Sequence, residues 1–364
     1  MLTPRPGILK IRPHMIAPGS GPAVDPLINI ASNESAYGPS QTTIAAGKGA
    51  LDGINRYTDA AVVRLSEALA SRFKLNPRGI VCGFGSDDLL ARLSRTYLSP
   101  GDELIYSVNG YQKTPNYAYG NDAVPVAAPD KDFKADVDSI LSCVSERTRV
   151  VMIANPDNPT GTYLSRAEVR RLHERLPANV LLVLDSAYLE YVDAVDFEDP
   201  WKMVEENRNV VMTRTFSKIH GLAGVRLGWL YAPEDVAKVI QAIGIMYPVS
   251  NVALACGLAS LSDDGYVEYV KAENLRIKRA FAARLTEMGV HVYPSQTNFV
   301  LARFNPEICT AAAVYDYLYG KRVLVRRFPA AAFANCIRFT IGLEDEMTQV
   351  LDHLRDFFAH NARR

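Results

Sequence analysis

The stretch RTFSKIHGLAGVRLG, residues 214–228, combines one lysine with hydroxyl residues, glycines and an arginine. Thr215, Ser217 and Lys218 lie almost in a row, and Arg226 follows the lysine after a glycine-rich turn. A buried lysine with a lowered pKa is the usual imine-forming nucleophile toward carbonyl compounds. Hydroxyls and an arginine close by suit a phosphate group. Together these features predict a site for pyridoxal phosphate. A solvated turn with a surface arginine is the alternative for this stretch taken alone.

The composition is that of an ordinary globular protein, with 48% hydrophobic and 22% charged residues. A chain of 364 residues exceeds what one core usually supports, so we expect two domains. Lys+Arg and Asp+Glu both number 40, which argues against nucleic acid or an anionic membrane as a partner. The five cysteines are scattered without a CxxC pair. This favours a reducing, cytoplasmic location and neither a metal site nor disulfides. No secretory signal or bilayer-spanning run is expected.

Several polar residues follow the ends of predicted strands. A strand at 80–82 runs into Gly83-Phe84-Gly85-Ser86-Asp87-Asp88 and a helix expected at 89–98, an arrangement that can bind an anion. The loop Asn155–Thr162, with two Asn-Pro pairs, follows a strand at 150–154. The apolar strand 180–184 ends in Asp185, which needs a positive partner if it is buried. A protonated pyridine nitrogen would serve, and so would an arginine.

These segments predict one site in an α/β fold. In a parallel sheet the carboxyl ends of the strands meet at one edge, so we expect the side chains that follow them to converge there. Arg338, in the strand 336–341, is a further candidate because arginine binds carboxylate or phosphate through a planar fork. An internal salt bridge is the alternative for Arg338. The residues expected to converge are Ser86, Tyr111, Asn158, Asp185, Tyr188, Ser217, Lys218, Arg226 and Arg338.

Taken together, these segments resemble those of the fold-type I pyridoxal-phosphate aminotransferases, and most of all those of the histidinol-phosphate aminotransferase family. The resemblance runs over nearly the whole chain, with its most specific parts at Asn155–Gly161 and Thr215–Gly228. It implies a large cofactor domain at about 41–250 with a mainly parallel sheet. It also implies a small α+β domain at 251–364, against which an N-terminal arm, residues 1–40, would pack. It further implies that the active unit is a homodimer.

The resemblance also implies roles for individual residues. Lys218 would bind the cofactor covalently and move the substrate proton, Asp185 would pair with the pyridinium nitrogen, and Tyr188 with Asn158 would hold the ring's phenolic oxygen. Tyr111 would stack on the ring. The phosphate would be held by Ser86, Asp87, Thr215, Ser217 and Arg226, with Tyr57 reaching it from the neighbouring subunit. Substrate contacts would come from Asn33, Tyr37 and Arg338, with Arg326 as the second arginine.

The expected reaction is transamination of histidinol phosphate with 2-oxoglutarate or glutamate, a step of histidine biosynthesis. The sequence departs from the family pattern at Phe84, at Tyr111–Pro115 and at Pro329–Phe333, where we expect the substrate side chain. An aminotransferase for aromatic or other amino acids is therefore an alternative. A pyridoxal-phosphate decarboxylase acting on an amino-acid phosphate is another, and a catalytically idle relative that binds the cofactor is a third.

Overall fold

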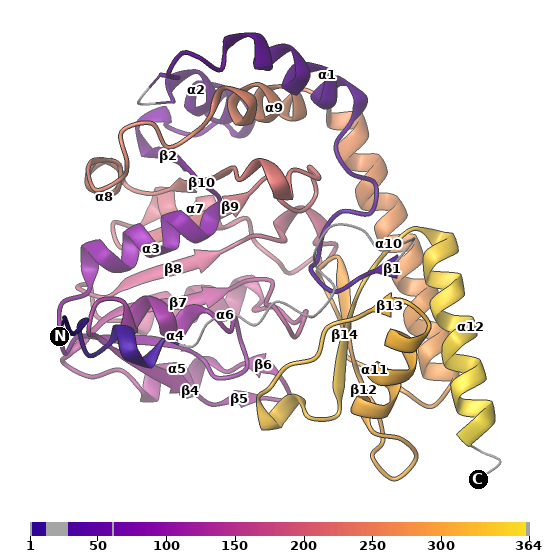
Figure 1. Cartoon of the computed structure of the whole chain (residues 1–364). Coiled ribbons are helices and arrows are strands. Elements are labelled where there is room, and N and C mark those ends of the chain that lie inside the picture. The colour runs from indigo at the N-terminus through magenta and orange to yellow at the C-terminus, as the bar shows by residue number, and fades with distance from the viewer. Residues whose placement is uncertain (1, 12–27, 60–61, 362–364) are drawn as a thin grey trace.

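The computed structural model describes residues 2–11, 28–59 and 62–361 and places them in two units (Figure 1). The larger unit is built on a seven-stranded sheet. Strand β10 is antiparallel to both of its neighbours, and the other neighbouring pairs run parallel, so the predicted mainly parallel sheet is confirmed. In spatial order the strands are β2 (Ile80–Gly83), β10 (Gly228–Tyr231), β9 (Val210–Thr215), β8 (Leu181–Asp185), β7 (Thr148–Ala154), β3 (Glu103–Ser107) and β4 (Val124–Ala128).

Helices cover both faces of this sheet, which explains why its central strands are apolar throughout. Successive residues of β8 point to opposite faces: Leu182 and Leu184 join one core cluster, and Leu181 and Val183 join the other. The first cluster is closed by α2 (Val63–Phe73), α5 (Val137–Ser142), α6 (Arg166–Arg175), α7 (Pro200–Glu206) and α9 (Asn251–Leu261). The second is closed by α3 (Ser86–Tyr97), α4 (Thr114–Tyr119) and α8 (Glu234–Ala242).

The smaller unit contains a three-stranded antiparallel sheet with its own core. Its sheet consists of β11 (His291–Val292), β12 (Phe299–Arg303) and β14 (Cys336–Thr340). The helices α10 (Asp264–Glu287), α11 (Ala311–Gly320) and α12 (Glu344–Asn361) pack on it. Strand β1 (Ile28–Asn29) pairs in parallel with β13 (Val323–Leu324), so the last part of the predicted arm joins this unit. Residues 2–11 of the arm contact the large unit instead, where the Gly7 amide donates to Asp122 Oδ1 at 2.7 Å. Residues 12–27 of the predicted arm lie outside the described residues.

The connection between the two units is the long helix α10 (Figure 1). Helix α9 starts at the predicted domain boundary, yet its residues Ala253 and Leu254 belong to the core of the large sheet. It packs there beside α1 (Gln41–Gly49). The boundaries at residues 40 and 250 stay predictions. No helix of the described residues is long and apolar enough to cross a membrane.

Local sequence signals set several helix ends. Helix α6 starts in a capping box, because Ser165 Oγ accepts from the Glu168 amide and Glu168 Oε2 accepts from the Ser165 amide. Helix α3 begins at Ser86, three residues before its predicted start at Leu89. The earlier start is decisive for the site, because it turns the first amides of α3 toward the carboxyl edge of the sheet.

Candidate active site

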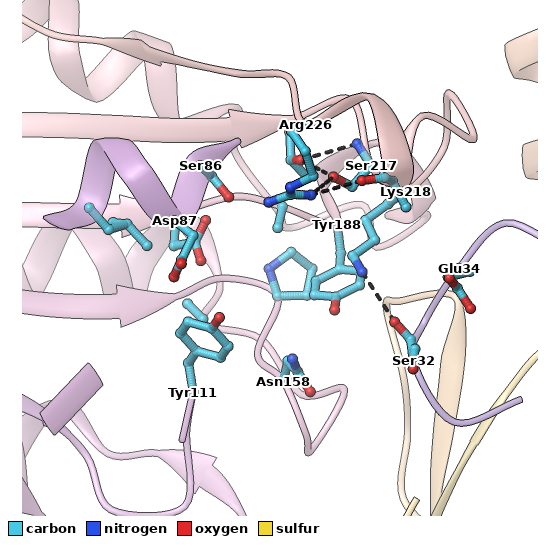
Figure 2. A pocket seen from close by; sticks show the side chains of 17 residues that line it. Ser32, Glu34, Ser86, Asp87, Tyr111, Asn158, Tyr188, Ser217, Lys218 and Arg226 are labelled. Atoms are coloured by element: carbon cyan, nitrogen blue, oxygen red, sulfur yellow. Dashed lines mark hydrogen bonds between the residues drawn. The ribbon is translucent and has the colours of Figure 1, made fainter. Parts of the chain in front are cut away.

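A cavity of about 240 Å³ lies at the carboxyl ends of the parallel strands, between the two units (Figure 2). Every residue predicted to bind the cofactor within one subunit lines it, from segments far apart in the sequence. Those residues are Ser86, Asp87, Tyr111, Asn158, Asp185, Tyr188, Thr215, Ser217, Lys218 and Arg226. Convergence of strand ends, expected from the topology, thus builds one polar cavity.

One end of the cavity is suited to a phosphate group. Helix α3 starts there at Ser86, after Gly85 with φ +83°, so its free amides and the positive end of its dipole face the cavity. Arg226 Nη1 lies 3.5 Å from Ser217 Oγ, and Thr215 Oγ1 donates to the same oxygen at 2.9 Å. Amides, hydroxyls and a guanidinium therefore gather around one point, as an anion requires (Figure 2).

The glycines keep this end open. A Cβ atom on Gly85 would lie 2.7 Å from Arg226 Nη2, in the space the guanidinium occupies. A Cβ atom on Gly228 would lie 2.4 Å from the Ser86 nitrogen, so only glycine lets β10 pass this close to the start of α3. The backbone of both glycines thus shapes the cradle.

Asp87 contributes its backbone to this cradle, whereas its carboxylate is directed toward Lys113 and Tyr117. The carboxylate accepts hydrogen bonds from Lys113 Nζ and from the Tyr117 hydroxyl. Lys113 belongs to the unusual segment Tyr111–Pro115 and neutralises a carboxylate that would otherwise repel an anion. The Tyr111 ring lines the cavity, and its stacking on a bound ring stays a prediction.

Lys218 follows Ser217 of the cradle, and its side chain extends away from it toward Ser32 (Figure 2). Its Nζ donates to the carbonyl oxygen of Ser32 at 3.4 Å and lies 5.8 Å from the centre of the Tyr188 ring. Burial and the positive charge of Arg338 lower the pKa of Lys218 to about 8. A substantial fraction of this amine is therefore neutral near pH 8, which a nucleophile toward a carbonyl needs.

Asp185 is a buried carboxylate at the end of the central strand β8. Its Oδ1 accepts from Thr213 Oγ1 at 2.9 Å, and within the described residues it forms no ion pair. Burial raises the pKa of Asp185 to about 6. An acid this deep needs a cationic partner from a ligand, and a protonated pyridine nitrogen is such a partner. Together with the anion cradle and Lys218, Asp185 shows that the cavity fits pyridoxal phosphate.

Asn158 and Tyr188 form the side of the cavity between Lys218 and Tyr111. Asn158 Oδ1 accepts from Arg338 Nη1 at 2.5 Å, which leaves the amide N–H₂ of Asn158 as the donor toward the cavity. Tyr188 is buried, its ring packs edge-on against Phe299 at 5.3 Å, and burial raises its pKa to about 12. Its phenol is therefore protonated at neutral pH and can donate a hydrogen bond.

The predicted substrate residues lie around the cavity and not on its wall. Arg338 is buried in β14, donates to the Ala31 carbonyl through Nη2 at 2.6 Å, and lies over the Phe299 and Phe328 rings. Arg326 forms a backbone bridge with Arg338, as expected for a neighbouring second arginine. Both substrate-binding roles stay predictions.

Asn33 and Tyr37, the predicted contacts from the arm, are also set back from the cavity. Asn33 is 1% exposed and donates to the Tyr188 hydroxyl. Tyr37 packs edge-on against Tyr269 with ring centres 5.5 Å apart. The residues of this segment that do line the cavity are Ser32 and Glu34, which were not among the predicted site residues. Their signal was present, since they flank Asn33 in the polar run Ala31–Glu34.

Two of the departures from the family pattern are absent from the cavity wall. Phe84 is 55% exposed beneath the Arg226 guanidinium, 5.5 Å from it. Phe333 is fully buried and stacks on Phe133 with ring centres 4.9 Å apart, so this residue of the segment Pro329–Phe333 serves core packing. Neither Phe84 nor the segment Pro329–Phe333 lines the cavity, so the structure gives no support to the expectation that they shape the substrate pocket.

Fold and site together define the class of protein. The chain belongs to the aminotransferase class I and II family, whose sequence model matches residues 25–354. It is 43% identical to the histidinol-phosphate aminotransferase of Rhodospirillum centenum over 354 residues, which cover 97% of this chain and 98% of that protein. It is 41% identical to the protein of the same name from Paramagnetospirillum magneticum, over 97% of this chain and 98% of that one.

A solved structure agrees with the fold. The histidinol-phosphate aminotransferase of Sinorhizobium meliloti, in complex with pyridoxal-5'-phosphate, superposes with a TM-score of 0.87 at 28% sequence identity. The match covers 92% of this chain and 91% of that chain. The two-unit fold is thus that of a fold-type I pyridoxal-phosphate aminotransferase, as the sequence indicated.

Proposed function

We propose that this chain is a pyridoxal-phosphate-dependent histidinol-phosphate aminotransferase that uses glutamate and 2-oxoglutarate as the second pair of reactants. The observation that carries the proposal is the single cavity in which Lys218, the buried Asp185 and the anion cradle at Ser86 face one another. The near full-length similarity to proteins named histidinol-phosphate aminotransferase supports the choice of substrate. Soluble, cytoplasmic catalysis fits the five free thiols.

When bound, pyridoxal phosphate supplies the electron sink that stabilises negative charge on the substrate's amine-bearing carbon. The chain supplies the rest. Asp185 would hold the ring nitrogen in its protonated form, and the cradle would hold the phosphate. Lys218 Nζ, whose pKa burial lowers to about 8, would accept the proton from the substrate's amine-bearing carbon and return it to the carbon on the other side of the amine nitrogen. Arg338 would hold the acceptor's carboxylate or the donor's phosphate.

The active unit is proposed to be a homodimer. Tyr57 is 81% exposed and stacks on Tyr247 with ring centres 4.2 Å apart, beside the exposed apolar residues Ile54 and Met246. Exposed apolar clusters of this kind mark protein–protein interfaces. A second copy covering this face would let Tyr57 reach the partner's phosphate cradle. An active mixture of a Lys218→Ala subunit with a Tyr57→Phe subunit, each poorly active alone, is the expected result.

Single-turnover spectroscopy tests the function. The protein loaded with cofactor is mixed with histidinol phosphate, phenylalanine or glutamate, and the visible band of the bound cofactor is followed. Fast bleaching with histidinol phosphate and with glutamate is expected. Fast bleaching with phenylalanine alone would favour an aromatic aminotransferase, and release of carbon dioxide without need for a 2-oxo acid would indicate a decarboxylase.

Lys218→Ala is the matched control, since it removes the covalent link and leaves the cradle and Asp185 in place. The variant should lack the lysine-bound band and should not transaminate. A Lys218→Ala protein with an unchanged spectrum would refute the assignment of this lysine. No bleaching with any amine would point to an idle cofactor-binding relative.

A further inference from the structure

The segment Ala31–Glu34 crosses from the small unit to the active site and contacts three functional side chains in succession. The Ala31 carbonyl accepts from Arg338, the Ser32 carbonyl accepts from Lys218, and the Asn33 amide donates to Tyr188. The first two are backbone contacts, which many residues could supply. The third depends on the Asn33 side chain, which was predicted to contact the substrate but is set back from the cavity.

Asn33 is held in one orientation. Its backbone lies in the left-handed region at φ 56°, and its amide N–H donates to Thr340 Oγ1 at 3.0 Å. The Thr340 hydroxyl donates in turn to Asn33 Oδ1 at 3.0 Å, so the Asn33 Nδ2 group faces Tyr188. Asn298 Nδ2 donates to the Asn33 carbonyl at 3.2 Å. With 1% of its surface exposed, Asn33 touches the cavity only through Tyr188.

This contact decides where the Tyr188 proton points. Asn33 Nδ2 donates to the Tyr188 oxygen at 2.8 Å, so one acceptor position of the phenol is filled from the arm side. A phenol has a single proton, and it cannot point at a group that is itself donating. The Tyr188 proton is therefore left to point into the cavity, where Tyr188 is a lining residue.

We propose that Asn33 is a positioning residue that orients the Tyr188 hydroxyl as a hydrogen-bond donor to the phenolic oxygen of the bound cofactor. The proposal rests on the function given above. It explains why a buried asparagine occupies a left-handed position next to the site. Because Asn33 follows β1 of the small unit and Tyr188 follows β8 of the large sheet, the bond also makes the donor strength of Tyr188 depend on how the two units dock.

The test is a spectral pH titration of the cofactor-loaded protein. A donor to the phenolic oxygen favours the deprotonated chromophore, so loss of the oriented donor should raise the midpoint of the titration. Asn33→Gly keeps the left-handed backbone and removes the side chain. We expect its midpoint to rise by about one pH unit, the size of one hydrogen bond to a charged group. Asn298→Ala is the matched control, because it removes a hydrogen bond to Asn33 without touching Tyr188.

A double-mutant cycle separates orientation from general loosening. In a Tyr188→Phe background, Asn33→Gly should leave the midpoint unchanged. No shift in the single variant, an equal shift in the Tyr188→Phe background, or an equal shift in Asn298→Ala would each overturn the proposal. Should Asn33→Gly fail to fold, Asn33→Asp takes its place in the cycle, and its shift should be larger when Tyr188 is present. If the wild-type protein forms no visible band with pyridoxal phosphate, the proposed function itself is wrong.

Discussion

Asp185 offers a stability measurement that tests the site without any substrate. The residue is 8% exposed, its carboxylate accepts from one hydroxyl, that of Thr213, and burial raises its pKa to about 6. In the unfolded chain its pKa is 3.8. The folded protein therefore binds more protons than the unfolded chain between these values, so stability falls as the pH rises through this window.

The magnitude follows from the shift. About two pKa units correspond to about 3 kcal/mol, which the cofactor-free protein should lose between roughly pH 4 and pH 7. Asparagine has nearly the same shape, does not ionise, and can still accept from Thr213 through its carbonyl oxygen. Asp185→Asn should therefore gain about 3 kcal/mol relative to wild type over this pH range.

The assay is urea unfolding of both cofactor-free proteins at a series of pH values, followed by far-UV circular dichroism. The difference between their free energies of unfolding should grow with pH and level off above about pH 7. Parallel pH profiles would refute the conclusion that Asp185 is a buried acid without a cationic partner. With cofactor bound the sign should reverse, because the pyridinium charge then stabilises the carboxylate of the wild-type protein alone.

Three further predictions concern the other parts of the cavity. The rate at which cofactor-free protein binds pyridoxal phosphate through Lys218 should rise about tenfold per pH unit up to about pH 8 and then level off. The reason is that burial lowers the pKa of Lys218 to about 8. A rate that still rises at about pH 10 would contradict this. Gly85→Ala should weaken cofactor binding, measured by equilibrium dialysis, by at least about tenfold, since alanine is strained at the φ of +83° and its Cβ would displace the Arg226 guanidinium from 2.7 Å away. Arg338→Lys should lower kcat/KM for 2-oxoglutarate by roughly 10²-fold through loss of the planar fork, whereas an unchanged kcat/KM would mean that this arginine serves only Asn158 and Ala31.

Much of the site could be predicted from the sequence because its residues lie at strand ends, tight turns and helix starts, which the sequence itself indicates. Gly85 marks the turn before α3, and Asp185 ends an apolar strand, so topology alone brings both to one edge of the sheet. The cavity residues that were not predicted come from the arm. Glu34 lines the cavity, whereas its neighbour Asn33 does not. In an irregular segment the sequence has no helical or strand period that would tell which of two adjacent side chains faces the site.

The sequence by itself determined the fold class, the lysine, the acid and the anion cradle, because each depends on short-range chemistry such as a strand end, a tight turn or a helix start. The tertiary structure alone decided which partner each group meets. It paired Arg338 with Asn158, placed Asn33 against Tyr188, and packed Phe333 into the core. Those contacts join residues far apart in the chain, and their geometry is set by how the two units pack against each other.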